Sequence, residues 1–199
     1  MLCGIDEAGR GPIAGPLVVA GVILLEKIDG LNDSKILSEK KRNKLFDEIK
    51  NKSKYHIVFT NAKTIDEKGL SFCLRNSIIE IMDNLKEFSD DFLMDGNTTF
   101  KIADLKCLIK ADATVQEVSA ASILAKVSRD NYMYEISGKY PNYDFEKHKG
   151  YGTKAHIDKI KKFGKSDEHR ISFKLKALGE LQEDVKTSGD EAMLLANSL

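Results

Sequence analysis

The chain has 199 residues, 42% of them hydrophobic, and 31 basic side chains balance 31 acidic ones, so its formal net charge is zero. This length and this hydrophobic content suit one globular domain with a proper core. The charge balance excludes a uniformly basic surface, so any polyanion has to be bound by local patches or metal ions. Cys3, Cys73 and Cys107 are widely spaced and form no metal-binding motif, which predicts reduced, mostly buried thiols of a cytosolic protein.

Near the N-terminus, two segments predict strands, Met1–Asp6 and Leu17–Leu24, joined by a turn rich in glycine and proline. The apolar run at residues 13–25 resembles the core of a signal peptide, but the flank before it carries two acids and the run is too short to span a bilayer. We therefore expect a buried strand, no membrane segment and a cytoplasmic location. Asp33–Lys54 then has the apolar spacing of a helix, and Tyr55–Asn61 alternates like a strand.

The middle of the chain continues this alternation. Thr64 and Glu67 have the spacing of a capping box, and apolar side chains at helical spacing follow over residues 70–85. Two further strands are predicted at Asp90–Asp95 and Leu105–Lys110.

A second capping box, formed by Thr114 and Glu117, precedes a helix rich in alanine and serine, whose small side chains let it lie close to a neighbour. Tyr140–Gly152 is predicted to be a loop. A basic helix follows over Thr153–Phe163 and ends at Gly164.

The last predicted helix is Phe173–Val185, and residues 186–199 are expected to form a polar, flexible tail. We therefore expect one catalytic domain over residues 1–185, including its C-terminal helices. Strands first, then strands alternating with helices, predict an α/β fold with a mixed sheet.

Four acidic residues end strands or lie between a strand and a helix. Asp6 and Glu7 close the first strand, Asp95 closes the strand before Gly96, and Asp112 precedes a helix. Ligands of α/β proteins bind at such strand ends, and clustered carboxylates suit Mg²⁺ or Mn²⁺. Acids in these places are most often caps or solvated turn residues, so each one alone carries little weight.

The loop that follows the first acids adds a second signal. Gly9 and Gly11 allow close approach of the backbone to a ligand, and Arg10 between them offers donors for phosphate or an ion pair with Glu7. Adjacent strand residues point to opposite faces, so Asp6 and Glu7 can share one site only if the strand ends or bulges there. Together these residues suggest phosphoryl-transfer chemistry.

Six motifs in order then resemble those of bacterial ribonuclease HII. They are DEAGRGP at residues 6–12, LNDSK at 31–35, MDG at 94–96, KADA at 110–113 with the small-residue helix after it, KGYGT at 149–153 with His156, and HR at 169–170 followed by SF at 172–173. An ordered set of this kind over most of the chain is specific. The opening motif differs from that of the related ribonuclease HIII.

The resemblance implies a ribonuclease H-like fold with a mixed sheet flanked by helices and a C-terminal helical extension. It also implies a metal-dependent endonuclease that cuts the RNA strand of RNA–DNA hybrids and nicks 5′ to a ribonucleotide embedded in duplex DNA, leaving 3′-hydroxyl and 5′-phosphate ends. Such an enzyme serves ribonucleotide removal and RNA primer processing, and we expect it to be a monomer.

The resemblance assigns the four acids to a site for two Mg²⁺ or Mn²⁺ ions. Asp6 would bridge both ions, Asp95 and Asp112 would each bind one or share one, and Glu7 would complete the shell and help to orient the substrate. Because a bound metal lowers the pKa of water, the histidines of the last two motifs are not needed as bases and are expected to be structural or to contact the backbone.

The resemblance also assigns substrate contacts. Gly9-Arg10-Gly11 takes the place of the loop whose backbone reads the ribose 2′-hydroxyl. Ser34 and Lys35 fall where the family contacts the backbone near the cut, and Tyr151 takes the place of the tyrosine that senses the junction between RNA and DNA. Lysines at residues 147–165 form a further candidate track for phosphates, although such a run is usually a solvated helix face.

Two departures from the family accompany these assignments. Ala111 replaces the usual glycine, and its methyl group is expected to shift Asp112 slightly. Asp167 and Glu168 stand where the family usually has an uncharged stretch, which would weaken local contact with DNA and alter the substrate preference.

Three alternatives stay open at this point. Another metal nuclease of the same fold, such as a junction resolvase or a transposase-like core, would cut four-way junctions. A non-catalytic module that binds hybrids would keep its function after Asp95→Asn. A Mg²⁺-dependent phosphatase would hydrolyse small phosphate esters and would have no use for the basic helix.

Overall fold

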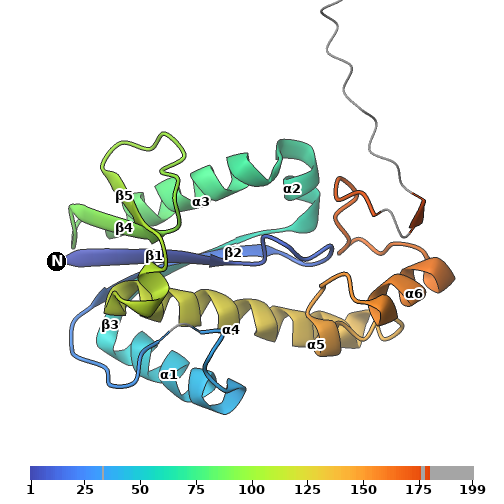
Figure 1. Cartoon of the computed structure of the whole chain (residues 1–199), viewed down its shortest axis with the longest axis horizontal. Coiled ribbons are helices and arrows are strands. Elements are labelled where there is room, and N and C mark those ends of the chain that lie inside the picture. Colours follow the sequence, from blue (N-terminus) through green and yellow to red (C-terminus); the bar gives the residue numbers. More distant parts are fainter. Residues whose placement is uncertain (33, 176–177, 180–199) are drawn as a thin grey trace, which may run out of the picture.

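A five-stranded mixed sheet forms the middle of the molecule in a computed structural model that describes residues 1–32, 34–175 and 178–179. Its strands run in the order β3-β2-β1-β4-β5 (Figure 1). β1 pairs antiparallel with β2 and parallel with β4, which confirms the predicted mixed pairing. The strands are β1 (Leu2–Ala8), β2 (Leu17–Leu24), β3 (Ser53–Thr60), β4 (Asp91–Asp95) and β5 (Leu105–Leu108).

Helices cover both faces of the sheet, so the fold has three layers (Figure 1). On one side lie α2 (Ala62–Lys68) and α3 (Leu70–Leu85), and on the other lie α1 (Glu39–Lys52) and the long α4 (Gln116–Lys139). Two shorter helices, α5 (Phe145–His148) and α6 (Lys154–Phe163), lie beyond the end of the sheet. The predicted α/β class is thus confirmed.

Alternation along β1 divides its side chains between two hydrophobic cores. Cys3 and Ile5 pack towards α3, whereas Gly4 faces α4. A Cβ atom on Gly4 would collide with the backbone of Glu117 and Val118, so α4 lies directly against the strand. The small side chains of α4 are buried there, as the sequence predicted.

Both predicted capping boxes are wrong. Asn61 caps α2, and its side chain accepts a hydrogen bond from the backbone N–H of Thr64, so Thr64 lies inside the first turn of that helix. The helix α4 has no side-chain cap, because the hydroxyl of Thr114 donates to the carbonyl of Lys110 instead. α1 is also shorter than predicted, since Ser38 caps it.

The C-terminal part agrees in outline. Thr153 caps α6 and Gly164 ends it, as predicted, while the predicted loop at Tyr140–Gly152 contains α5. The predicted helix Phe173–Val185 is not helical at residues 173–175; most of its remainder and the predicted tail at 186–199 lie outside the described residues. No described helix is long and apolar enough to cross a membrane.

Candidate active site

The carboxyl ends of two parallel strands place Asp6 beside Asp95. Pairing between β1 and β4 runs from Leu2↔Asp91 to Ile5↔Met94, so each acid is the next residue along its own strand. On its other side β1 stays paired with β2 as far as Ala8, so the strand does not end at Asp6 as predicted. Beyond Ile5 the edge of β1 that faces β4 is therefore open to a ligand.

Asp112 joins these acids from a single 3₁₀ turn, η1 (Ala111–Ala113), that follows β5. The backbone N–H of Ala111 donates to Oδ1 of Asp95 over 2.8 Å, which fixes the turn against the end of β4. Burial raises the pKa of Asp6 well above its ordinary value, and the charges of Glu7, Asp95 and Asp112 raise it further. The four predicted acids thus share one electrostatic environment.

Glu7 has one paired and one unpaired oxygen. Its Oε1 lies 3.2 Å from Nη1 of Arg10, so the ion-pair alternative for Arg10 is confirmed. Its Oε2 is buried and has no hydrogen-bond partner within the described chain. Burial raises the pKa of Glu7, and the charge of Arg10 opposes that shift. A buried carboxylate oxygen without a donor is costly, unless a cation binds it.

These donors suit a hard divalent cation. In the residues that the structure describes, no three potential ligands are already grouped around one point. The acids have protein partners instead, and Nζ of Lys35 lies 3.7 Å from Oδ2 of Asp112. A divalent ion would neutralise the buried negative charge, reduce the repulsion among the acids and give Oε2 of Glu7 a partner. The residues present therefore suit a divalent metal ion.

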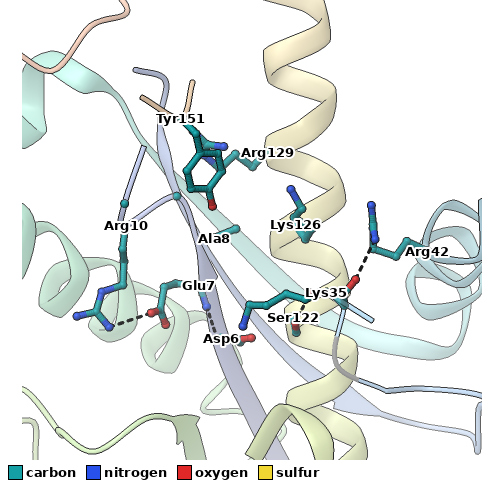
Figure 2. A pocket seen from close by; sticks show the side chains of 13 residues that line it. Asp6, Glu7, Ala8, Arg10, Lys35, Arg42, Ser122, Lys126, Arg129 and Tyr151 are labelled. Carbon is teal, nitrogen blue, oxygen red and sulfur yellow. Dashed lines mark hydrogen bonds and ion pairs between the residues drawn. The ribbon is translucent and has the colours of Figure 1, made fainter. Parts of the chain in front are cut away.

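A cleft of about 490 Å³ opens next to these acids (Figure 2). Asp6 and Glu7 line it, whereas Asp95 and Asp112 are not among its lining residues. All of the predicted substrate contacts line it as well: Gly9, Arg10, Gly11, Ser34, Lys35 and Tyr151. Five further lining residues were not predicted as site residues, which are Ala8, Arg42, Ser122, Lys126 and Arg129.

Two of the missed residues hold the segment that carries Ser34. The hydroxyl of Ser122 on α4 donates to Oγ of Ser34 over 2.6 Å, and Nη1 of Arg42 on α1 donates to the carbonyl of Ser34 over 2.9 Å. Ser34 is buried as a result. Ser122 lies in the small-residue stretch of α4, but nothing in that stretch identifies its partner.

Tyr151 lies at one end of the cleft and is 47% exposed. Figure 2 shows the ring beside Arg129, whose guanidinium carbon lies 6.0 Å from the ring centroid. The carbonyl of Tyr151 contacts Nδ1 of His156 over 2.9 Å, and His156 contacts His169. Both histidines are buried and are held by contacts within the protein, as the expectation of a structural role requires.

Several C-terminal charges that the sequence analysis expected to affect nucleic-acid binding have partners within the protein. Both carboxylate oxygens of Glu168 accept hydrogen bonds from the hydroxyl of Tyr132, over 3.0 and 2.9 Å. Lys147 and Lys159 both form ion pairs with Asp144, over 3.3 and 3.2 Å. Surface pairs of this kind are weak, so they reduce the lysine track without abolishing it.

Comparison with known proteins agrees with this site. The family model for Ribonuclease HII matches residues 3–176. A curated Ribonuclease HII from Aliarcobacter butzleri is 74% identical over 187 residues, which cover 94% of this chain and 97% of that protein. The chain belongs to the ribonuclease HII family. It is therefore a ribonuclease H, a hydrolase that acts as an endonuclease.

Solved structures support the same fold for this member of the ribonuclease HII family. A chain in the structure of the PCNA:RNase HII complex from Archaeoglobus fulgidus is 27% identical with a TM-score of 0.77, and the match covers 88% of this chain and 96% of that one. The ribonuclease H2 from Pyrococcus horikoshii is 28% identical with a TM-score of 0.71, over 85% of this chain and 92% of that one.

Proposed function

We propose that this ribonuclease HII family member is a metal-dependent endonuclease that cuts the RNA strand of RNA–DNA hybrids. We propose that it also nicks duplex DNA 5′ to an embedded ribonucleotide, leaving 3′-hydroxyl and 5′-phosphate ends. Its role would be ribonucleotide removal and RNA primer processing. The observation that carries the proposal is the adjacency of Asp6 and Asp95 beside a loop suited to contact ribose.

Two Mg²⁺ or Mn²⁺ ions, held by Asp6, Glu7, Asp95 and Asp112, would supply an activated water and stabilise the leaving oxygen. Asp6 and Asp95 would be able to bind the same ion, because they lie next to each other on neighbouring strands. Glu7 brings an oxygen that needs a positive partner. Asp112 completes the set from the turn that Asp95 itself holds in place through Ala111.

The cleft offers separate groups for ribose and for phosphate. Backbone N–H groups of the Gly9–Gly11 loop suit the 2′-hydroxyl, which is the feature that separates RNA from DNA. Ser34, Lys35 and Arg10 would contact the phosphate backbone near the cut. The exposed ring of Tyr151 would stack on a sugar or base at the junction between RNA and DNA.

The decisive experiment maps cleavage of a duplex that carries one ribonucleotide, with Mg²⁺, with Mn²⁺ and with a chelator. The proposal expects one nick 5′ to the ribonucleotide that depends on metal, and no cut in the matching all-deoxy duplex or in an all-DNA four-way junction. A chelator-resistant nick, or equal cutting of the all-deoxy duplex, would contradict it.

Asp95→Asn is the matching variant, expected to lose at least about a thousandfold in kcat while it still binds the duplex. Asp91→Asn is its control, because Asp91 begins the same strand and pairs with Lys106 over 2.9 Å, far from the cleft. The control should cleave at the rate of the unaltered protein.

A further inference from the structure

Two buried arginines lie at the cleft: Arg129 lines it, and Arg170 does not. Arg129 on α4 and Arg170 after α6 are each 1% exposed. In the described part of the chain, both guanidinium groups donate to backbone carbonyls rather than to carboxylates. Burial lowers the pKa of Arg129, and burial with the charge of Arg129 lowers that of Arg170 to about 10, so both stay charged at neutral pH. Burying such charges costs free energy, so we expect these two arginines to have a role other than packing.

Arg129 joins the two segments that the proposed function assigns to ribose and to the junction. Its Nε donates to the carbonyl of Pro16 over 2.9 Å and its Nη2 to that of Ala14 over 3.0 Å. Its Nη1 donates to the carbonyl of Lys149 over 2.9 Å, two residues before Tyr151. One side chain therefore fixes the position of the Tyr151 segment relative to the N-terminal loop.

Arg170 holds the ribose loop itself. Its Nη2 donates to the carbonyl of Gly9 over 2.7 Å and its Nη1 to that of Arg10 over 3.3 Å. Its Nε donates to the carbonyl of Gly15 over 3.0 Å. The planar guanidinium thus binds both ends of one loop, which a lysine ammonium cannot do with the same geometry.

The orientation of these carbonyls determines where the loop's N–H groups point. No cis peptide bond is present in the described chain, and in a trans peptide unit the C=O and the N–H point in opposite directions. Because the carbonyls of Gly9 and Arg10 face Arg170, the N–H groups of Arg10 and Gly11 face away from it. Neither N–H donates to another protein group in the described chain. Both residues line the cleft, and Arg170 does not.

Glycines allow the backbone to approach these arginines closely. Gly9 has a φ of +98°, and a Cβ there would collide with Nε of Arg129 and the carbonyl of Pro16. Gly150 has a φ of +80°, and a Cβ there would collide with the carbonyl of Ala14. The backbone at Gly9 therefore packs directly against Arg129, and the backbone at Gly150 packs directly against Ala14.

We propose that Arg129 and Arg170 are positioning residues for ribose selection: they turn the N–H groups of Arg10 and Gly11 into the cleft and fix them relative to Tyr151. This inference rests on the proposed function, because it explains how the same cleft would select a ribonucleotide. Both guanidinium groups already donate to backbone carbonyls, so the arginines would act through the loops that they hold. Their effect is on the preference for ribose over deoxyribose, not on the metal site.

The test measures binding by fluorescence anisotropy, with Asp95→Asn in every protein so that no strand is cut. The probes are a duplex with one ribonucleotide and the matching all-deoxy duplex, both with Mg²⁺. Arg170→Lys and Arg129→Lys keep the charge but lose the fixed fork of donors. Each is expected to reduce the preference for the ribonucleotide about tenfold, the scale of a lost hydrogen bond to the 2′-hydroxyl, with affinity for the all-deoxy duplex changed less than about twofold.

Two controls separate positioning from stability. Arg75→Lys changes an exposed arginine on α3, and Ile78→Val weakens the core on the same helix. Both should leave the preference unchanged. Amide hydrogen exchange gives a second measure, since Arg170→Lys should speed exchange in residues 9–16 and leave that of α3 unaltered.

An unchanged preference in both lysine variants, together with unchanged exchange in residues 9–16, overturns the inference and leaves the proposed function standing. A parent protein that binds both duplexes equally also overturns the inference alone, whereas a protein without Asp95→Asn that makes no metal-dependent nick 5′ to the ribonucleotide overturns the proposed function, and this inference falls with it. The two failures are therefore distinct.

Discussion

Nε2 of His169 lies 3.0 Å from Nε2 of His156, and the neighbours of the pair decide which nitrogens carry protons. The backbone N–H of Ser166 donates to Nδ1 of His169 over 2.8 Å, so the proton of His169 is on Nε2. His156 then accepts at Nε2 and donates from Nδ1 to the carbonyl of Tyr151. The chain of hydrogen bonds holds only while both rings are neutral, because two protonated rings would bring two N–H groups face to face.

This arrangement predicts the pH dependence of the pair. Burial lowers the pKa of each histidine from 6.5 to about 4. The unfolded chain binds protons at higher pH than the folded one, so the stability that the pair contributes is complete above pH 6.5 and is lost as the pH falls towards 4. Nitrogen-detected NMR titration should find both rings neutral at pH 5, with the tautomers given above. A midpoint near 6.5 for either ring would contradict this.

Removing a charge from the cluster of acids should stabilise the protein when metal is absent. Asp6 is buried among like charges, and both effects raise its pKa, so Asp6→Asn should raise the metal-free free energy of unfolding. In the unaltered protein, Mg²⁺ or Mn²⁺ should raise Tm, and the variant should lose that increase. Calorimetry with and without a chelator measures both effects.

The control for Asp6→Asn is Asp29→Asn, at a site where the side chain is 89% exposed and pairs only with Lys27 among the described residues. It should change stability by less than about 0.5 kcal/mol and keep the response to metal. A metal-free Asp6→Asn protein that is less stable than the parent would show that repulsion does not dominate at this site.

Two glycines with similar φ angles allow the cost of backbone strain to be separated from the cost of a steric collision. Gly150→Ala and Gly69→Ala both force alanine into a positive φ, at +80° and +84°, but a Cβ on Gly69 meets no atom within 4 Å. Gly69→Ala should cost about 1–3 kcal/mol, because its φ of +84° and ψ of +149° lie in a region that alanine rarely adopts, and Gly150→Ala should cost more, since its Cβ also collides with a backbone carbonyl. Urea unfolding gives both values. Equal costs would mean that the Ala14 segment moves aside freely.

A pair of serines tests whether the Ser34 segment needs its anchor. Ser122→Ala removes the hydrogen bond to Ser34, and Ser77→Ala removes a 3.3 Å contact to Thr60 on the far side of the sheet. Each should cost about 1 kcal/mol of stability. Only Ser122→Ala should raise KM for the ribonucleotide duplex, by about fivefold, because a comparable energy is lost in placing Ser34. A similar rise in KM for Ser77→Ala would indicate a general loss of folding.

Sequence reasoning found the strands and the acids because both depend on local patterns. Apolar runs ending in Asp6 and Asp95 predicted the strand ends to within two residues. The capping boxes failed because another residue was better placed, as Asn61 was for Thr64. Local spacing shows which residues are able to cap a helix, but not which of them does so.

The supports of the site could not be predicted from sequence patterns, because their partners are remote along the chain. Ser34 and Ser122 are 88 residues apart, and Arg129 contacts Pro16 across 113 residues. A serine in a small-residue helix or an arginine in a polar one looks like an ordinary packing or surface residue. Burial alone distinguishes them, and burial depends on the assembled fold.

Gly9 and Arg170 are separated by 161 positions yet joined by one 2.7 Å hydrogen bond. During synthesis all four acids are present in the chain once Asp112 is translated, whereas the loop after Glu7 still lacks its anchor. That loop adopts its final form only when nearly the whole described chain is available to fold. If Arg170 positions this loop as we propose, selectivity is the last property that a nascent molecule acquires, and a copy terminated before Arg170 would carry the acids without it.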